Sequence, residues 1–448
     1  MSMEILTVKE YDTIMNNPEY EDRYAYLPDK PFSTLLEFVH GFEGDNVNSD
    51  VLEFCRIGFR RGVGETVSVS NYVGTIQTGS GYQIEILPKV SLQEGDQGNE
   101  GTKRIFLQML RSMHGFPGKV LSDAKLKVSK MNLYEIFIRM YVEGVKELVK
   151  KGLKSAYVGR EENLTQFKGK LLIRNHIRYN LTHKERFYVG YDEYHVNRPE
   201  NRIIKATLEK LLRVSKSASV QREIRELLIS FELVEPSINH ATEFSKITLD
   251  RSTRQYEEVL SWSKVFLLNE SFSTFSGNAN AKSLLFPMEK VFESYVAKKL
   301  KRALADTGWQ VKAQAWGKYL FEDPRKFALS PDIVIKRDDN SVVILDTKWK
   351  VLNDNPGQNY GISQSDMYQM FAYSHRYGTP EIWLLYPINE KVRGLDSIEY
   401  RNDDPVRVRV FFVDLENMDQ SMAKLRSLLM KKEDTKSMDT PEIGRAHV

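Results

Sequence analysis

The fold of this chain is decided by two neighbouring stretches of sequence, SPDIVI at residues 330–335 and VVILDTK at residues 342–348. Both are short, apolar and rich in β-branched residues, and the polar residues 336–341 between them are typical of a turn. The two stretches are therefore expected to pair as a β-hairpin. Asp332, at the start of one strand, and Asp346, near the end of the other, would then meet at one end of a sheet.

Two acids and an amine at one sheet end suit metal-dependent cleavage of a phosphodiester. Magnesium prefers hard oxygen ligands, polarises the phosphate and lowers the pKa of the attacking water. We expect Asp332, Asp346 and the main-chain carbonyl of Thr347 to supply those oxygens. Lys348 shares a strand face with Asp346 and would orient or deprotonate the water, or offset charge on the phosphate. Short patterns of this kind also arise by chance, with both aspartates merely flanking strands.

Two predicted helices flank the hairpin and offer further polar side chains. Glu289 and Glu293 lie one turn apart on the preceding helix and are candidates for an additional carboxylate. Gln369 and Tyr373 lie one turn apart on the following helix and can face the same site. For each of these four residues alone, a solvent-exposed or core-edge position is an equal alternative.

The C-terminal part of the chain has a regular order of elements. The apolar periodicity predicts a helix, three strands, a second helix and two more strands. They are expected at Leu285–Leu304, Trp309–Ala315, Asp332–Lys336, Val342–Lys348, Ser363–Arg376, Glu381–Tyr386 and Val406–Val413. Such an order suits a nuclease core.

The first hundred residues are rich in β-forming segments, and the middle of the chain is mainly helical. We expect a small antiparallel sheet or partial barrel, closed by an acidic, glycine-rich loop at residues 94–101, with strands at residues 66–70, 72–76 and 82–87. Helical spacing follows at residues 103–113, 132–151, 201–214, 221–233 and 254–268. A segment rich in Ser, Gly and Asn at residues 271–283 predicts a linker.

Composition limits the class of protein. The 448 residues suggest two or three domains, and 41% hydrophobic and 28% charged residues are typical of a soluble globular protein. No apolar run reaches the ~18 residues of a membrane span, and the first residues lack the layout of a signal peptide. The single cysteine, Cys55, excludes an internal disulfide and a cysteine-based zinc site. A cytoplasmic location is therefore expected.

The charge is nearly balanced overall but locally basic. The net charge is only +3, whereas residues 146–186 contain 11 Lys or Arg and 4 Glu. This segment is either a solvated face or a contact for phosphates or a partner. It overlaps residues 160–199, a long stretch of mixed character between helices that is expected to project from the helical region.

The sequence lacks both a nucleotide-binding P-loop and a His-Glu-x-x-His zinc-binding motif. The nearest match to a P-loop, Gly115–Lys119, is too short and lacks the final hydroxyl residue, so the chain should not hydrolyse a nucleoside triphosphate by itself. No His-Glu-x-x-His pattern occurs, and His176 and His183 are better explained as helix-face or loop residues. A zinc site is not expected.

Three groups of motifs resemble the McrC family, the nuclease subunit of McrBC-type, modification-dependent restriction systems. The first group is near the N-terminus, the second surrounds the basic segment and the third contains the acidic pair. They are Tyr72–Gly74 with Ile84–Lys89; Phe167–Leu171, Tyr191–Glu193 and Asn201–Lys205; and Met288–Val296, Ser330–Asp332 and Asp346–Lys348. Together they span most of residues 60–385.

The resemblance implies a Mg²⁺-dependent endodeoxyribonuclease with a PD-(D/E)xK domain. It implies an McrB-like AAA+ partner that binds GTP and recognises modified double-stranded DNA of the 5-methylcytosine type. It also implies that the N-terminal part docks on the partner's ring, inserts into it and stimulates GTP hydrolysis, with residues 160–199 as a contacting projection. Two alternatives remain: a non-enzymatic adaptor of an AAA+ ring with a decayed nuclease domain, and a stand-alone, RecB-like repair nuclease.

The expected fold is a multidomain α+β protein. It combines an N-terminal β-rich domain, a helical, partner-docking region with the projecting insertion, an α/β restriction-endonuclease-like domain and a disordered tail. These are assigned to residues 1–100, 101–275, 276–430 and 431–448.

Overall fold

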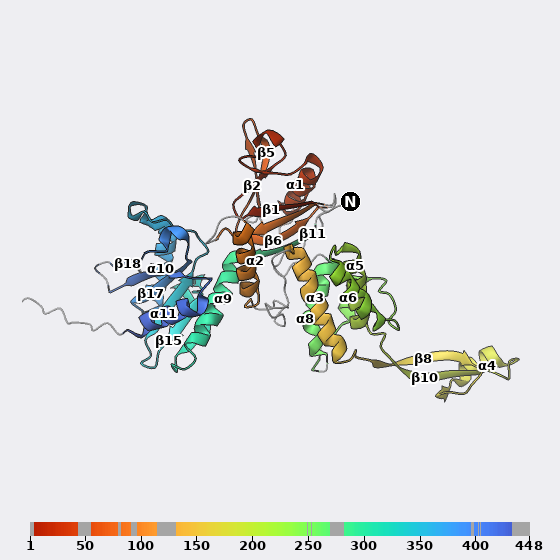
Figure 1. Ribbon diagram of the computed structural model, residues 1–448. Coiled ribbons are helices and arrows are strands. Elements are labelled where there is room, and N and C mark those ends of the chain that lie inside the picture. Colours follow the sequence, from red (N-terminus) through yellow and green to blue (C-terminus); the bar gives the residue numbers. More distant parts are fainter. Residues whose placement is uncertain are drawn as a thin grey trace, which may run out of the picture. The chain divides into compact units, whose positions relative to one another are not determined.

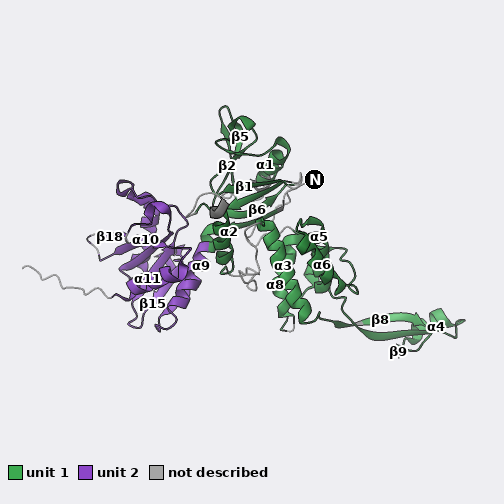
Figure 2. Ribbon diagram, viewed as in Figure 1, with its two compact units in different colours: residues 1–291 green, residues 292–448 purple. Residues whose placement is uncertain are grey.

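The computed structural model forms two compact units, residues 1–291 and 292–448 (Figure 2). It describes residues 4–43, 55–78, 82–90, 96–113, 131–248, 250–251, 253–268, 282–395, 398–401, 403 and 405–431. Most of the predicted linker, the Gly115–Lys119 segment and nearly all of the predicted tail lie outside these ranges. In the described part of the chain no helix has the length and apolarity needed to span a membrane.

Two four-stranded sheets form the β-rich part of the first unit. Their strand orders are β1-β7-β6-β11 and β3-β2-β5-β4. The strands are β1 (Glu4–Lys9), β2 (Thr13–Met15), β3 (Ala25–Tyr26), β4 (Cys55–Arg60), β5 (Gly64–Val69), β6 (Tyr72–Gln77), β7 (Tyr82–Leu87) and β11 (Lys282–Pro287). The three predicted strands are confirmed. The prediction of a single antiparallel sheet is wrong. There are two sheets, and β1 pairs with β7, and β2 with β3, in parallel.

Strand β11 corrects the predicted start of a helix at Leu285. Its residues pair antiparallel with β6, and the helix α9 begins only at Met288 and ends at Ala303. The apolar run around Leu285 has no periodicity that separates a strand from a helix. Pairing with a distant strand therefore decided its structure.

Helices make up most of the remainder of the first unit (Figure 1). They are α1 (Asp29–Glu43), α2 (Asp96–Leu110), α3 (Leu133–Lys150), α5 (Pro199–Val214), α6 (Ala218–Ile229), α7 (His240–Lys246) and α8 (Glu257–Leu268). The predicted loop at residues 94–101 is wrong from Asp96 onward, where α2 begins. Helix α3 packs against α8, where Phe137 and Tyr141 contact Trp262 and Phe266.

The projecting insertion is a long β-hairpin with a small helix, here called the arm (residues 156–195). It contains β8 (Ala156–Leu164), β9 (Lys170–Leu171), α4 (Ile173–Asn180) and β10 (Phe187–His195), and Figure 1 shows it extending away from the helices of its unit. The base of the arm is held by Asn201, which is fully buried and donates to the carbonyls of Lys154 and Val196. Tyr256 donates to Asn201 and accepts from the Lys154 amide.

The second unit is built on a six-stranded mixed sheet. The strand order is β12-β15-β16-β17-β19-β18, formed by Gln310–Ala313, Ile333–Lys336, Val342–Thr347, Glu381–Pro387, Arg407–Val413 and Ile398–Arg401. The predicted hairpin is confirmed, because β15 and β16 pair antiparallel. Helix α10 (Gln364–Tyr377) connects β16 to the parallel β17. Helix α11 (Met418–Met430) and the strands β13 (Lys318–Glu322), β14 (Arg325–Leu329) and β18 were not predicted.

We expect Gly74→Ala to disrupt the β6–β11 pairing. Gly74 has a φ of +148°, and a Cβ there would lie 1.8 Å from the Leu284 carbonyl oxygen. Backbone strain and this clash should lower the stability of the sheet by more than about 2 kcal/mol. Hydrogen–deuterium exchange of the β6 and β11 amides measures the effect.

Gly64→Ala is the matched control for this test. Gly64 also has a positive φ, +100°, but a Cβ at this position would meet no atom within 4 Å. The Gly64→Ala variant should show the effect of backbone strain alone, so its amides should lose less protection from hydrogen exchange. Equal protection in the Gly74 and Gly64 variants would contradict the role of the close approach.

Candidate active site

The β15–β16 register places Asp332 against the end of the neighbouring strand. Ile333 pairs with Leu345, so Asp332 precedes β15 at the level where β16 ends. The Thr347 amide and hydroxyl donate to Asp332 Oδ2 at 2.7 and 2.6 Å. These two bonds hold the half-buried carboxylate in one orientation.

Asp346 lies within the centre of the sheet. It is 1% exposed, on a strand that has neighbours on both sides. Lys348 Nζ lies 2.7 Å from Asp346 Oδ2. Among the described residues this oxygen accepts no hydrogen bond of standard geometry, so the contact is ionic and the oxygen retains acceptor capacity.

Helix α10 extends the site by two side chains. Lys348 Nζ donates to Gln369 Oε1 at 2.9 Å, and Gln369 Nε2 donates to the Tyr373 hydroxyl at 2.8 Å. The helix is positioned by Ser363, whose hydroxyl accepts from the Asp366 amide as an N-cap. Five of the predicted residues, Asp332, Asp346, Lys348, Gln369 and Tyr373, therefore form one connected group.

A second ion pair lies close to the first and was not predicted. Lys350 Nζ donates to Asp366 Oδ2 at 2.8 Å, and the Tyr386 hydroxyl donates to the same oxygen at 3.4 Å. The spacing from Ser363 to Asp366 is a helix-capping pattern that the sequence already contained. Burial favours a higher pKa for Asp366, but the bonds from Lys350 and Ser363 outweigh it and hold the pKa below its ordinary value.

Burial and like charge shift the titration of the acidic pair. Burial, followed by the nearby Asp332, raises the pKa of Asp346 to about 7, against the opposing effect of Lys348. Burial also raises the pKa of Asp332, although the bonds from Thr347 oppose it. Burial favours a lower pKa for Lys348, but the Asp346 carboxylate outweighs it and raises that pKa. The lysine is therefore an ammonium at neutral pH.

Neither glutamate of α9 completes a three-acid cluster with Asp332 and Asp346 among the described residues. Glu289 belongs to the first unit, where it accepts from Asn71 at 3.1 Å. Glu293 is half-buried on α9 in the second unit. Within the described ranges no three acidic, histidine or cysteine side chains lie close enough together to hold a metal ion.

The donor set nevertheless fits magnesium. Mg²⁺ is usually bound through one or two carboxylates and keeps several waters, so a third acidic side chain is not required. Asp346 is buried and Asp332 half-buried, and the charge of Asp332 raises the proton affinity of Asp346, which a divalent cation would relieve. Asp346 Oδ2 has unused acceptor capacity. Thr347, whose carbonyl is the expected third oxygen, directly follows Asp346 and binds Asp332.

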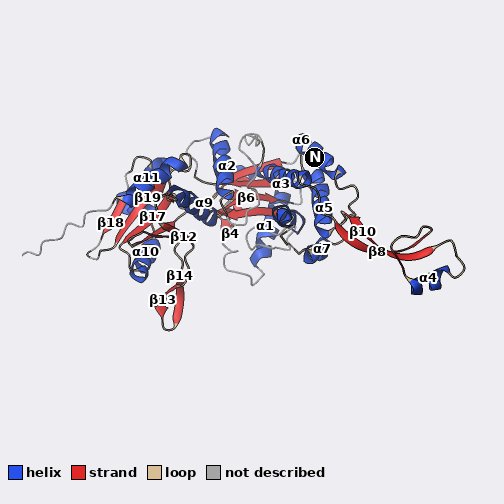
Figure 3. Ribbon diagram, turned by 90° about the horizontal axis from the view of Figure 1, so that it is seen from below, coloured by secondary structure: helices blue, strands red, loops and turns tan. Residues whose placement is uncertain are grey.

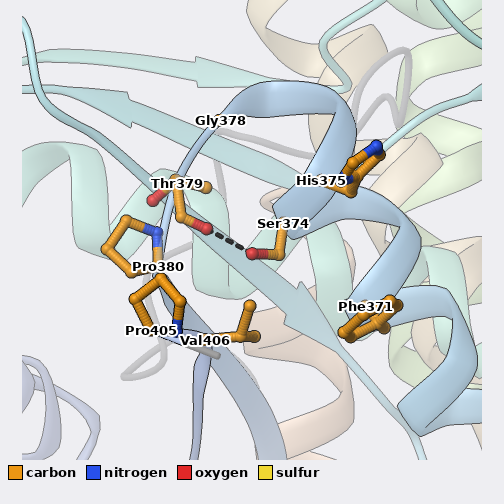
Figure 4. Close-up of a pocket in the computed structure, with 8 residues that line it drawn as sticks. All are labelled: Phe371, Ser374, His375, Gly378, Thr379, Pro380, Pro405 and Val406. Atoms are coloured by element: carbon orange, nitrogen blue, oxygen red, sulfur yellow. Dashed lines mark hydrogen bonds between the residues drawn. The ribbon is translucent and has the colours of Figure 1, made fainter. Parts of the chain in front are cut away.

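A pocket of about 620 Å³ in the same unit lies away from these residues (Figure 4). It is at the other end of the sheet, where Pro380 and Val406 precede the parallel strands β17 and β19. In Figure 4 the Ser374 hydroxyl points to the Thr379 carbonyl, to which it donates. The lining contains neither a carboxylate nor an ammonium group, so it lacks the chemistry of the acidic pair.

Comparison with known proteins identifies relatives of the chain. Residues 67–387 match a family model described as McrBC 5-methylcytosine restriction system component. No curated protein matches the sequence significantly.

Two solved structures from Thermococcus gammatolerans contain similar chains. The first is a refined half-complex from the tetradecameric assembly of McrB AAA+ hexamers with bound McrC, with a TM-score of 0.72, 19% identity, and coverage of 95% of this chain and 100% of that one. The second is the cryo-EM structure of the McrBC complex, with a TM-score of 0.49, 20% identity, and coverage of 67% and 88%. The first similarity shows a shared fold.

We expect the buried acid to make stability depend on pH. The folded pKa of Asp346 is about 7, and its unfolded value is about 4. The stability that the protonated acid contributes is therefore complete below about pH 4 and is lost as the pH rises through about 7. Asp346→Asn cannot ionise, so in EDTA at pH 8 it should be more stable than the unsubstituted chain by on the order of 1–2 kcal/mol.

Denaturant unfolding of the second unit at pH 4, 6 and 8 measures this difference. The difference between the two proteins should grow with pH. Asp354→Asn is the control, because Asp354 is exposed on the same unit. A difference that stays constant from pH 4 to pH 8 would show that Asp346 does not titrate in this range.

Proposed function

The chain belongs to the family of McrBC 5-methylcytosine restriction system components, and from this membership we propose that it is the DNA-cleaving subunit of a GTP-dependent restriction complex. Its reaction is the Mg²⁺-dependent hydrolysis of phosphodiester bonds in double-stranded, modified DNA. Its partner is an McrB-like AAA+ GTPase that binds the GTP and recognises the modification.

The observation that carries this proposal is the joining of a buried and a half-buried acid with one ammonium at a single sheet end. Asp332, Asp346 and the Thr347 carbonyl would hold the magnesium ion, which supplies charge neutralisation at the phosphate and a lower pKa for water. Asp332 is kept in place by Thr347 at 2.7 and 2.6 Å. A ligand held by two hydrogen bonds needs little reorganisation when substrate arrives.

Lys348 acts as a fixed cation. Before the magnesium ion binds, the Asp346 carboxylate outweighs burial and raises the pKa of Lys348, so the side chain is an ammonium. As a cation it orients the nucleophilic water and offsets the charge that develops on the phosphate. Gln369, which accepts from Lys348 and donates to Tyr373, holds the ammonium in position.

We expect Asp346→Ala to lower DNA cleavage by at least about a thousandfold, because it removes one of the two carboxylates needed for the metal ion. Partner binding and stimulation of the partner's GTPase should stay unchanged. DNA cleavage is measured on a methylated duplex with Mg²⁺, GTP and the partner. GTPase stimulation is measured by phosphate release. Asp354→Ala, at an exposed acid of the same unit, is the control and should cleave normally.

Three other outcomes of this assay would refute the site or indicate a different function. Cleavage retained by a folded Asp346→Ala protein would refute the assignment of the site. A chain that stimulates the GTPase but does not cleave is a non-enzymatic adaptor. Cleavage without partner or GTP indicates a stand-alone nuclease.

The arm provides a surface for docking on the partner. Ile173, Ile177 and Leu181 follow one another at helical spacing on α4 and the turn after it, and are 66%, 57% and 75% exposed. An exposed apolar stripe of this kind is typical of a protein-binding surface. Part of the basic charge is used within the arm, since Arg160 pairs with Glu193 at 2.6 Å and Lys168 lies over the Tyr191 ring. The structure with the same fold comes from McrB AAA+ hexamers with bound McrC, which supports such a partner.

We expect the double substitution Ile173→Asp with Ile177→Asp to weaken partner binding at least tenfold, which corresponds to about 1.4 kcal/mol. Two carboxylates on the apolar stripe would have to be desolvated in the interface. Titration of GTPase stimulation against chain concentration measures the affinity. Ile229→Asp is the control, because Ile229 is 71% exposed on α6 of the same unit. Equal affinities for the arm variant and the control would exclude the stripe as the docking surface.

A further inference from the structure

The second unit has a two-stranded hairpin directly before its acidic pair. Strands β13 and β14 pair only with each other and are not part of the six-stranded sheet. Figure 3 shows this hairpin extending beyond the sheet of its unit. Leu329, the last residue of β14, is followed after Ser330 and Pro331 by Asp332. The hairpin is therefore tied to the site by a very short connection.

The hairpin exposes large aromatic side chains. Trp316, Phe321 and Phe327 are 84%, 56% and 70% exposed. The Phe321 and Phe327 rings lie edge to face, 6.0 Å apart, and Phe327 has a φ of +59°, a region that aromatic residues rarely adopt. Three exposed aromatic residues on one short element mark an interaction surface, because their burial is favourable only in a complex.

The base of the hairpin is anchored to the helix that carries Gln369 and Tyr373. Lys318 Nζ donates to the Arg376 carbonyl of α10 at 2.8 Å and lies over the Tyr377 ring. Arg376 in turn pairs with Glu322 of β13. These contacts anchor the hairpin to the C-terminal end of α10, while only Ser330 and Pro331 separate its second strand from Asp332.

The charge of the hairpin indicates which kind of molecule binds to it. Residues 318–329 contain three cations and two acids, a net charge of +1: Lys318, Arg325, Lys326, Glu322 and Asp323. Lys318 is engaged with α10, whereas Arg325 and Lys326 are exposed. Arg325 is 3.7 Å from Glu322 with its side chain 73% exposed, an ion pair that contributes little. A second copy of the chain docked symmetrically would set like charges against each other. A polyanion bound to the hairpin would not face this repulsion, because its charge is opposite to that of Arg325 and Lys326.

We propose that the β13–β14 hairpin is a DNA-contacting element that inserts its aromatic side chains into a groove of the duplex beside the cleaved phosphodiester. Arg325 and Lys326 contact the phosphate backbone, and Phe321, Phe327 and Trp316 contact the bases or sugars in the groove. This inference rests on the proposed function, because it names the surface by which the nuclease site receives its substrate.

Binding of a fluorescent duplex to the full chain, measured by anisotropy in EDTA, tests the hairpin without cleavage. Trp316→Ala with Phe327→Ala should weaken binding at least tenfold. Tyr368→Ala is the matched control, because Tyr368 is 66% exposed on α10 of the same unit and should bind as the unsubstituted chain does. Arg325→Ala with Lys326→Ala should reduce the slope of log affinity against log salt by about 1–2.

Failure of this inference differs from failure of the proposed function. The binding assay needs no catalysis, so an Asp346→Ala chain that has lost cleavage should still show the hairpin effect. Equal duplex affinity of the aromatic double variant and the Tyr368 control would overturn the inference, as would absence of duplex binding by the unsubstituted chain. Loss of self-association in sedimentation, with duplex affinity unchanged, would assign the hairpin to a second copy instead.

Discussion

The bonds from Thr347 to the Asp332 carboxylate are the interaction on which the candidate site depends. They connect the start of β15 to the end of β16, and they exist only because Ile333 pairs with Leu345. A shift of one residue in this register would reverse the faces of the strand and separate the two acids. The position of Asp332, the burial of Asp346 and the reach of Lys348 all follow from that pairing.

A buried acidic pair is unfavourable by itself, and the surrounding side chains offset the cost. Lys348 neutralises part of the charge and is itself held by Gln369. The second pair, Lys350 with Asp366, does not add to this compensation, because the Asp366 carboxylate raises the pKa of Asp346 further. Asp346 still has a pKa raised to about 7, so the compensation is incomplete. Incomplete compensation at a buried acid is common where a protein binds a cation or performs chemistry.

Several motif residues of the first unit have a structural explanation. Gly74 allows β11 to approach β6, and Gly169 allows its turn to approach β10, where a Cβ would lie 2.5 Å from the Gly190 carbonyl oxygen. Asn201 binds the carbonyls at both ends of the arm. Glu85 is 1% exposed and binds Lys103 and the Leu133 amide. These residues act on backbone geometry and on the attachment of elements, and of them Asn201 holds the base of the arm.

The sequence by itself determined the local structure and the candidate chemistry. Two short apolar runs rich in β-branched residues and a polar turn were sufficient to predict the β15–β16 hairpin, and the spacing of Gln369 and Tyr373 was sufficient to place them on one helix face. Only the tertiary structure decided that β11 joins a sheet whose other strands lie far away in the sequence, that Glu289 binds Asn71, and that Lys350 pairs with Asp366 close to the site. The physical reason is that periodicity reports which side of an element is apolar. Which distant element covers that side depends on packing and hydrogen bonding across the whole unit.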